Sequence, residues 1–259
     1  MIFPISENIP ALENMKKYPK ELYGIGNLEL LTRPKVSIVG TRRPSSYTKH
    51  FTYLLSQALS KRGVCIVSGA AMGVDAIAHN GAGVENTIAV VANSLNVRYP
   101  AVNRLLIEAI EKEGLMMSQF PETFKATPWS FVVRNELVVA LGDVLIVTEA
   151  DENSGSMRSV EFALKMGKKI FVLPQKLDES RGTNKLLSDG LAEPIYDVET
   201  FADIYGVSPK NDSIEKDEFF YFCQKSPTLD SAIEQFSNRV YEAELEGLIF
   251  IENGLVRLV

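Results

Sequence analysis

Three short turns in this chain each follow an apolar, strand-like run and combine glycine with serine, threonine or arginine. Glycine lets the backbone approach a ligand closely, and the helix start that follows presents unpaired N–H groups with a partial positive charge. Any one such turn is a common connection in α/β proteins, but three after three strands predict one phosphate site at one edge of a sheet. The residues concerned are Gly40, Thr41, Arg42 and Arg43, then Ser68 and Gly69, and then Ser154, Gly155 and Ser156.

A fourth segment adds groups suited to unpaired bases. Phe131 precedes Arg134 and Asn135 near the start of a predicted helix, and an aromatic ring beside an arginine suits stacking on bases. The competing interpretation places Phe131, and with it Trp129, in the hydrophobic core. Lys125, in the preceding loop, is either a solvated side chain or a contact to a nucleic-acid backbone.

The residues that could perform catalysis do not form a recognisable constellation. Asp75 and His79 lie four apart on one predicted helix, but no serine or cysteine nucleophile accompanies them, so we expect them to shape the pocket. The sequence lacks a Walker motif for nucleotide hydrolysis, an acidic cluster for two-metal chemistry, and clustered Cys, His and acidic residues at metal-ligand spacing. We therefore expect neither an enzyme nor a bound metal or cofactor.

Composition and charge are those of an ordinary globular protein. Of 259 residues, 46% are hydrophobic and 23% charged, and no apolar run reaches the ~20 residues that span a membrane. The net charge of −6 disfavours nucleic acid, yet residues 216–259 hold 8 acidic and 4 basic residues, so the remainder is nearly neutral and can carry a basic groove. The N-terminus lacks a signal-peptide pattern, and Cys65 and Cys223 read as core thiols, which together predict a cytoplasmic location.

Strand-like and helix-like segments alternate from residue 35 onward, which predicts an α/β fold with a doubly wound, mostly parallel sheet. Five glycines are expected to end helices in the left-handed conformation, namely Gly63, Gly114, Gly142, Gly167 and Gly190. The predicted strands are 35–39, 64–68, 87–92, 115–118, 143–148, 169–173 and 193–196, and the predicted helices are 47–62, 72–82, 101–113, 130–141, 156–166 and 183–189.

Changes in pattern and composition divide the chain into four regions. They are an irregular arm at 1–34 with a short helix near 10–18, the α/β domain at 35–205, a polar linker at 206–215 and a terminal module at 216–259. The terminal module reads as three short helices and an Asn-Gly hairpin, which indicates a small winged-helix fold. Its third helix carries Glu242, Glu244 and Glu246 beside Arg239, so a protein partner is favoured over DNA or simple packing.

Several motifs occur in one order, and together they resemble the DNA processing protein A family, also called DprA or Smf. The resemblance covers about residues 35–197. The motifs are KVSIVGTRRP at 35–44, IVSGAAMGVDAIAH at 66–79, YPAVN at 99–103, Arg134-Asn135, Glu149-Ala150 followed by SGS at 154–156, VLP at 172–174 and GTN at 182–184.

The resemblance implies an extended Rossmann-like domain with a basic pocket for single-stranded DNA, and a winged-helix appendage. It also implies a non-enzymatic homodimer that protects incoming single strands and helps load the RecA recombinase during natural transformation. Matched motif by motif, the pocket would use Gly40, Thr41, Arg42, Arg43, Ser68, Gly69, Phe131, Arg134, Asn135, Ser154, Gly155, Ser156 and Met157.

The chain departs from the family pattern in three places. Glu136 stands where a second arginine is usual, which predicts a weaker positive field, and Gln119 replaces a usual glutamate. The arm is shorter than the helical domain that some members carry. Two other functions stay open: a nucleotide-base hydrolase of the lysine-decarboxylase-like group, whose Pro-Gly-Gly-x-Gly-Thr-x-x-Glu signature is missing, and a nucleotide-sensing module.

The sequence also offers a surface for the dimer that the resemblance implies. A short apolar helix leads into the last predicted strand, which we expect at the sheet edge, where two copies can pair by two-fold symmetry. The interface would comprise Leu186, Leu187, Leu191 and Ile195. The competing expectation is that Leu186 and Leu187 pack inward on their own sheet.

Overall fold

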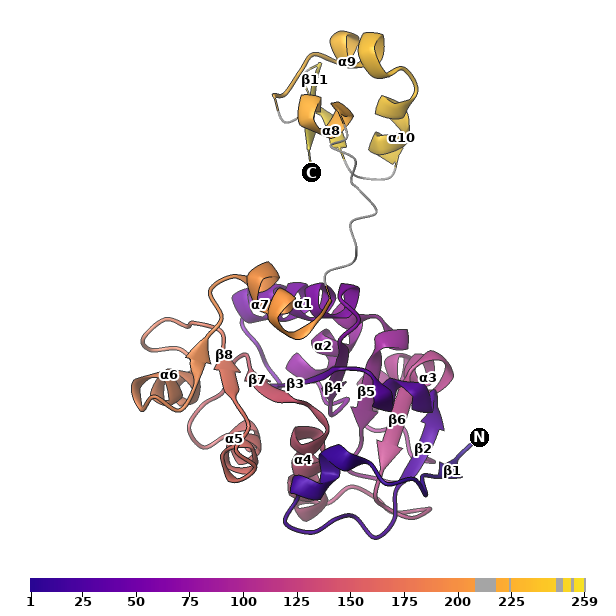
Figure 1. Ribbon diagram of the computed structural model, residues 1–259, viewed down its shortest axis with the longest axis vertical. Coiled ribbons are helices and arrows are strands. Elements are labelled where there is room, and N and C mark those ends of the chain that lie inside the picture. Colours follow the sequence, from indigo (N-terminus) through magenta and orange to yellow (C-terminus); the bar gives the residue numbers. More distant parts are fainter. Residues whose placement is uncertain (208–217, 224, 246–248, 253, 259) are drawn as a thin grey trace. The chain divides into compact units, whose positions relative to one another are not determined.

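The computed structural model describes residues 1–207, 218–223, 225–245, 249–252 and 254–258. The chain forms two compact units, Met1–Ser208 and Pro209–Val259 (Figure 1).

A nine-stranded sheet forms the first unit, with the strand order β1-β2-β6-β5-β4-β3-β7-β8-β9. The strands from β3 to β9 pair in parallel, whereas β1 and β2 run antiparallel at one edge. The strands are β1 (Phe3–Pro4), β2 (Tyr23–Gly26), β3 (Lys35–Val39), β4 (Cys65–Ser68), β5 (Thr87–Val90), β6 (Leu115–Ser118), β7 (Val144–Val147), β8 (Ile170–Val172) and β9 (Glu193–Pro194).

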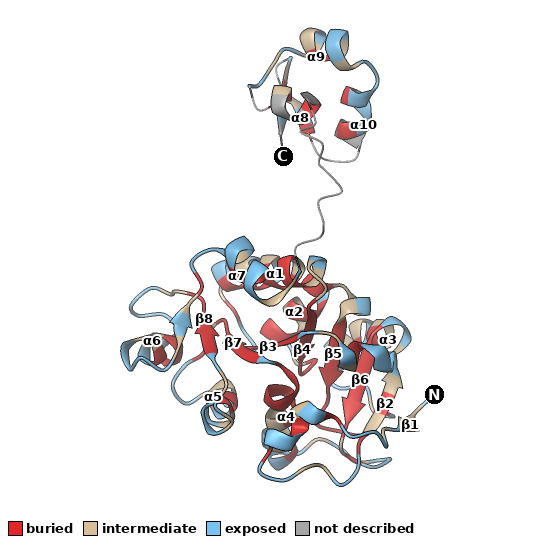
Figure 2. Ribbon diagram, in the orientation of Figure 1, coloured by how far each residue is buried: buried red, intermediate tan, exposed pale blue. Residues whose placement is uncertain are grey.

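Helices cover both faces of this sheet, which is why its strands read as continuous apolar runs. Val36 and Ile38 of β3 belong to a core with α1, α2 and α7, whereas Val39 belongs to a core with α4 and α5. Figure 2 shows the central strands buried between these helices. The helices are α1 (Ser46–Lys61), α2 (Val74–Ala82), α3 (Arg104–Glu113), α4 (Pro128–Leu141), α5 (Gly155–Lys165), α6 (Arg181–Ser188) and α7 (Val198–Tyr205), with 3₁₀ helices at Pro10–Asn14, Leu28–Thr32, Val84–Asn86 and Ala101–Asn103.

The strand order reverses at β3. The chain runs outward from β3 through β4 and β5 to β6, and then returns to place β7 on the other side of β3. The register pairs Val39 with Val147, so the turns that follow β3 and β7 leave the sheet side by side. Such a reversal point opens a crevice at the carboxyl ends of the strands, where α/β proteins bind ligands.

The predicted α/β class and mostly parallel sheet are confirmed, and all seven predicted strands occur, five of them shortened at one or both ends. The expectation of an irregular arm was wrong, because β1 and β2 extend the sheet beyond β6. The signal in β2 is weak because two of its four residues are glycine. Its Gly24 is needed there, since a Cβ would lie 2.7 Å from the ring of Phe3. The sequence also did not indicate α7.

The glycine caps divide into two groups. Gly63, Gly167 and Gly190 adopt the left-handed conformation with φ of +81°, +65° and +67°, as predicted. The prediction was wrong for Gly114 and Gly142, whose φ values are −102° and −82°. These two are small for close packing, since a Cβ on Gly142 would overlap Ser37 and one on Gly114 would overlap the carbonyl oxygen of Val84.

The predicted dimer surface is largely internal. Leu186 and Ile195 are 3% and 5% exposed and belong to the two cores of their own chain, and Leu187 is half-buried against one of them. Leu191 alone of the four is exposed. The apolar face of the α6 helix therefore packs against the core of its own chain.

The second unit contains α8 (Glu218–Cys223), α9 (Leu229–Phe236), α10 (Arg239–Leu245) and an antiparallel hairpin of β10 (Ile249–Glu252) and β11 (Leu255–Leu258). The expected order of three helices and a hairpin is confirmed, although Asn253 of the hairpin turn lies outside the described residues. Of the predicted linker at 206–215, residues 208–215 also lie outside them. Val207 belongs to the first unit, where its N–H donates to the carbonyl oxygen of Arg62 at 3.1 Å.

Candidate functional site

A cavity of about 310 Å³ lies where β3 and β7 end and α5 begins, with α4 as its other wall. Asp75 and Ser159, which the sequence did not single out for binding, also line it. The structure brings nine of the predicted site residues to this cavity: Gly40, Thr41, Arg42, Phe131, Arg134, Asn135, Ser154, Gly155 and Ser156.

The turn after β3 is hydrogen-bonded to two other segments of the chain and carries the exposed side chain of Arg42. The N–H of Thr41 donates to the carbonyl oxygen of Glu149 at 2.8 Å, and its own carbonyl oxygen accepts from the N–H of Val74 at 3.1 Å. Gly73, with φ of +79°, approaches so closely that a Cβ would lie 2.5 Å from that same oxygen. Arg42 leaves the turn exposed, with its guanidinium carbon 5.5 Å from the centroid of the Phe131 ring.

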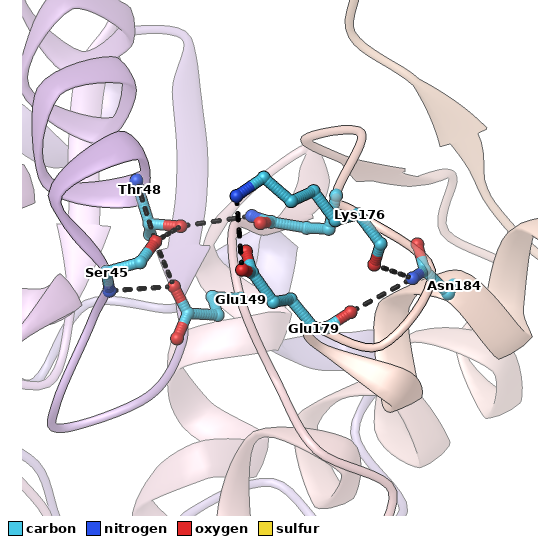
Figure 3. A network of polar contacts seen from close by, with 7 residues as sticks. Ser45, Thr48, Glu149, Lys176, Glu179 and Asn184 are labelled. Carbon is cyan, nitrogen blue, oxygen red and sulfur yellow. Dashed lines mark hydrogen bonds and ion pairs between the residues drawn. The ribbon is translucent and has the colours of Figure 1, made fainter.

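Glu149 fastens the far end of this turn to the segment that follows β7. Its Oε2 accepts hydrogen bonds from the N–H and Oγ of Ser45 at 3.0 and 2.9 Å (Figure 3). Ser45 in turn caps α1 by accepting from the N–H of Thr48 at 3.2 Å. Gln175 donates to Thr48 Oγ1 and to the carbonyl oxygen of Thr148 at 3.0 and 2.9 Å. The Glu149 carboxylate therefore holds neighbouring segments together, and Glu149 does not line the cavity.

Ser154 and Ser159, from the segment that begins α5, line the cavity. Among the residues that the structure describes, Ser154 Oγ and Ser159 Oγ are buried and have no hydrogen-bond partner. Buried polar atoms are nearly always paired, so two unpaired hydroxyls lining one cavity indicate a place where a polar ligand binds. The first N–H groups of a helix also lack intrahelical acceptors. A Cβ on Gly155 would meet nothing within 4 Å, so the approach to this helix start is open.

Arg134 lines the cavity, but its guanidinium forms hydrogen bonds with other parts of the protein. Its Nη1 donates to the carbonyl oxygens of Gly69 and Val90 at 2.5 and 2.9 Å, and its Nε donates to Asn135 Oδ1 at 3.0 Å. The side chain is 6% exposed, and Asp75 is the opposite charge that stabilises it. Arg134 therefore joins the turn after β4 to α4, and contributes a fixed positive charge rather than a mobile one.

Asp75 and His79 support the same turn from α2. Asp75 Oδ2 accepts from the N–H of Ala71 at 3.3 Å; burial raises the pKa of this carboxyl, and Arg134 opposes that rise. His79 Nε2 accepts from the N–H of Ala70 at 3.3 Å, which leaves the ring proton on Nδ1 to donate to Thr87 Oγ1 at 2.5 Å. Burial lowers the pKa of His79 from 6.5 to about 3, so the ring is neutral.

We expect the buried His79 to make the protein less stable in mild acid. The unfolded chain takes up a proton near pH 6.5 and the folded chain near pH 3, so stability is present above pH 6.5 and is lost as the pH falls through this window. The loss due to His79 should reach about 2 kcal/mol at pH 5, from roughly 1.4 kcal/mol per pH unit. Urea unfolding at pH 7 and pH 5 measures it.

The matched variants for this measurement are His79→Gln and His50→Gln. His79→Gln removes the titrating group, so its stability should fall less between pH 7 and pH 5 than that of the wild type. His50 is exposed on α1, so His50→Gln should keep the wild-type pH dependence. An equal acid-induced loss in all three proteins would contradict the assignment of this titration to His79.

Five predicted site residues lie outside the cavity. Arg43 and Lys125 are exposed and line neither this cavity nor the smaller neighbouring cavity that Tyr99 and Pro100 border. Ser68 is fully buried, and its hydroxyl donates to the carbonyl oxygen of Ile38 at 2.7 Å, so it cannot serve a phosphate. Met157 is half-buried against the core. Gly69 lines the neighbouring cavity, and it must be glycine because a Cβ would overlap the Arg134 guanidinium.

Glu136 and Asn103 have contacts that the sequence did not indicate. Glu136 does not line the cavity: its Oε1 accepts from the N–H of Lys16 at 3.3 Å, which directs the carboxylate to the arm and away from the positive groups. Asn103 was missed as a site residue, although it lies in one of the motifs. Its Nδ2 donates to the carbonyl oxygens of Ala70 and Ala71, both at 3.0 Å, and so holds the turn after β4.

Two kinds of site were not found in the described part of the chain. No group of three or more His, Cys, Asp or Glu side chains there could hold a metal ion. No helix among the same residues has the length and apolar character to cross a membrane.

Residues 1–206 match the family model for DNA recombination-mediator protein A. The chain belongs to this family. Among solved structures, DNA processing protein A from Helicobacter pylori, described for its single-stranded DNA binding mode, has a TM-score of 0.77 and 43% identity, covering 78% of this chain and 94% of that one. The DprA structure from Streptococcus pneumoniae has a TM-score of 0.73 and 31% identity, covering 79% and 74%.

The curated DprA relatives are longer proteins. Protein Smf from Synechocystis is 37% identical over 180 residues, which cover 66% of this chain and 45% of the relative. DprA from Bacillus subtilis is 32% identical over 194 residues, covering 73% and 65%. The matched region therefore spans about half to two thirds of these relatives.

Proposed function

We propose that this DprA-family chain binds single-stranded DNA, with little sequence preference, in the cavity between β3, β7 and α5. The observation that carries the proposal is that Ser154 and Ser159, whose hydroxyls have no hydrogen-bond partner among the described residues, line the same cavity as the exposed Arg42 and the Phe131 ring. These groups suit a phosphate and an adjacent base, and none of them forms a hydrogen-bonding pattern for one base edge. The Helicobacter pylori relative supports the same ligand.

A mobility-shift comparison of single-stranded and duplex DNA of equal length tests this function. We expect clear preference for the single strand, and an affinity that falls steeply with salt, because phosphate contacts release counterions. A mononucleotide should compete weakly. Equal affinity for duplex DNA, or binding of the mononucleotide alone, would reject the proposal in favour of another nucleotide-binding function.

We further propose a non-enzymatic role in DNA recombination in the cytoplasm. The bound strand would be shielded from nucleases and passed to the RecA recombinase during natural transformation, as family membership and the resemblance suggest. Two assays examine this directly: the survival of a labelled single strand with an added nuclease, and the rate of RecA filament assembly on strands coated with a single-stranded DNA-binding protein. No acceleration of assembly would remove the RecA step.

We propose that the working form is a homodimer, with a surface different from the one expected from sequence. Leu186 and Ile195 are internal, but Leu191 and Tyr196 are 43% and 85% exposed beside the edge strand β9, and Leu177 is 92% exposed. Exposed apolar side chains beside a sheet edge favour self-association. Sedimentation should give a dimer at micromolar concentration, and Leu191→Arg should shift it to a folded monomer.

The second unit, for which we propose a winged-helix fold, is expected to contribute little to DNA binding. Removing residues 209–259 should change the affinity for single-stranded DNA by less than roughly fivefold, about 1 kcal/mol. The reason is charge: α10 carries exposed Glu242 and Glu244, which repel phosphates. We propose a protein partner for this unit instead. Anisotropy titration of both proteins measures the difference, and a loss above tenfold would show that the unit contacts DNA.

A further inference from the structure

A second, smaller cavity adjoins the first and extends the site toward α3. It lies between the turn after β4 and the segment that follows β5, and its volume is about 20 Å³. Both cavities are lined by Arg42, Phe131 and Arg134, so these side chains form the wall between them. The other side of the second cavity is formed by Met72, Tyr99 and Pro100.

We propose that the two cavities are two subsites for one strand: a phosphate binds in the first cavity, and the unpaired base of the neighbouring nucleotide stacks on a shelf made by Tyr99 and Met72. This inference rests on the proposed single-stranded DNA binding. A space of about 20 Å³ holds little more than a water molecule, so the base lies across the rim and is not enclosed. A shelf of this kind accepts any base, because every base has a flat π-face.

The shelf lies next to Phe131, the aromatic residue that lines the phosphate cavity. The rings of Tyr99 and Phe131 have centroids 6.2 Å apart at an angle of 51°. Tyr99 and Met72 are 46% and 43% exposed, so both side chains are open to a ligand. Because Tyr99 and Met72 line a cavity that shares Arg42 and Phe131 with the phosphate cavity, a strand of DNA bound at the phosphate cavity can reach them.

The charges around the shelf favour stacking over phosphate contacts. Arg98 pairs with Glu111 at 2.7 Å, and Arg104 pairs with Glu108 at 2.9 Å, so both nearby arginines are neutralised. The exposed Arg42, whose guanidinium lies over Phe131 in the wall that both cavities share, is the cation that we assign to the phosphate. The two subsites should therefore differ in how their contributions respond to salt.

The segment that carries Tyr99 is hydrogen-bonded at both of its ends. Asn93 Nδ2 donates to the carbonyl oxygens of Ser94 and Val97 at 2.8 and 2.5 Å, which closes the start of the segment. Asn103 fastens its end to the turn after β4 through two hydrogen bonds. A segment fixed at both ends loses little backbone freedom on binding, which adds to the contribution of its side chains to affinity.

The test is a salt series of binding to a short oligothymidylate, with Tyr99→Ala as the main variant. We expect the affinity to fall about tenfold, because one stacked base loses its partner, while the slope of log K against log salt stays at the wild-type value. Tyr99→Phe should keep most of the affinity. Tyr53→Ala is the matched control, because Tyr53 is 44% exposed on α1 and lines neither cavity.

An abasic strand of the same length supplies a second measurement. Wild-type protein should bind it less tightly, and Tyr99→Ala should lose little more on it, because the ring and the base contribute through the same contact. Met72→Ala, expected to weaken binding about threefold by removing part of the stacking surface, serves if Tyr99→Ala fails to fold. Circular dichroism and thermal melting check the folding of each variant.

The outcomes separate this inference from the proposed function. If the wild type does not bind the oligothymidylate, single-stranded DNA binding itself is wrong. If the wild type binds and a folded Tyr99→Ala protein binds equally well, the function stands and the stacking shelf is rejected. A Tyr99→Ala protein with a flattened salt slope would also reject it, because that result would place a phosphate there. An unchanged affinity with impaired RecA assembly would assign the surface to a protein.

Discussion

Arg42→Glu is expected to weaken single-stranded DNA binding by roughly a hundredfold at physiological salt. Arg42 is exposed and lines both cavities, so the substitution places an anion where we place a phosphate. The slope of log K against log salt should flatten by about 0.7 for each phosphate that the protein no longer neutralises. Fluorescence anisotropy of a labelled oligonucleotide over a salt series measures both quantities.

The neighbouring Arg43 provides the control for this result. Arg43 is exposed on the same turn, but it lines neither cavity, and its N–H donates to Thr41 Oγ1 at 3.2 Å. Arg43→Glu makes the same change in net charge, so it should cost less than roughly tenfold through the general field alone. Equal losses in the two variants would show that the total charge of the turn matters and that the cavity does not.

Arg134→Met is expected to lower the free energy of unfolding by about 3 kcal/mol, because it leaves the buried Asp75 carboxylate without its opposite charge. It also removes the donors to the carbonyl oxygens of Gly69 and Val90, so the turn after β4 loses its link to α4. We expect single-strand affinity to fall roughly tenfold even where the variant is folded, because the cavity wall is no longer fixed. Urea unfolding and anisotropy titration measure the two effects.

Two comparisons show whether the buried charge pair is the cause. Adding Asp75→Asn to Arg134→Met should recover part of the lost stability, since the uncompensated carboxylate is removed. Arg158→Met changes a solvent-exposed arginine that pairs with Glu161 on the surface of α5, so it should stay within about 0.5 kcal/mol of the wild type. If the double variant is as unstable as Arg134→Met alone, the cost comes from poorer packing.

Most of the fold could be predicted from local pattern. The central strands are covered on both faces, so runs such as Val144–Val147 are apolar throughout and easy to recognise. The strands at the edge were harder, because β1 and β2 are short and are specified by their contacts: Gly24 is fitted to the ring of Phe3, and β2 is paired with β6 far along the chain.

The location of the candidate site could be predicted from the sequence more easily than the role of each of its residues. The structure brings together turns that the motif positions singled out, since Gly40, Arg42 and Gly155 line the same cavity. Burial and hydrogen bonding then separate residues of similar type. Ser68 and Ser154 are both serines at strand-to-helix turns, but the hydroxyl of Ser68 bonds to Ile38 and that of Ser154 is unpaired among the described residues. Arg42 and Arg134 differ in the same way, and the distinction depends on contacts distant in sequence.

Asn135 joins two helices that border the cavity. Its side chain accepts from Arg134 and donates to the carbonyl oxygen of Gly155 at 3.3 Å, so α4, α5 and the turn after β4 form one hydrogen-bonded chain across the cavity. The complete site therefore exists only in the folded sheet, and a strand that binds there selects the folded state. A strand at a hundred times its dissociation constant would add about 2.7 kcal/mol to the stability of the first unit. DNA would thus act on this protein as a folding ligand, raising its melting temperature and slowing its proteolysis.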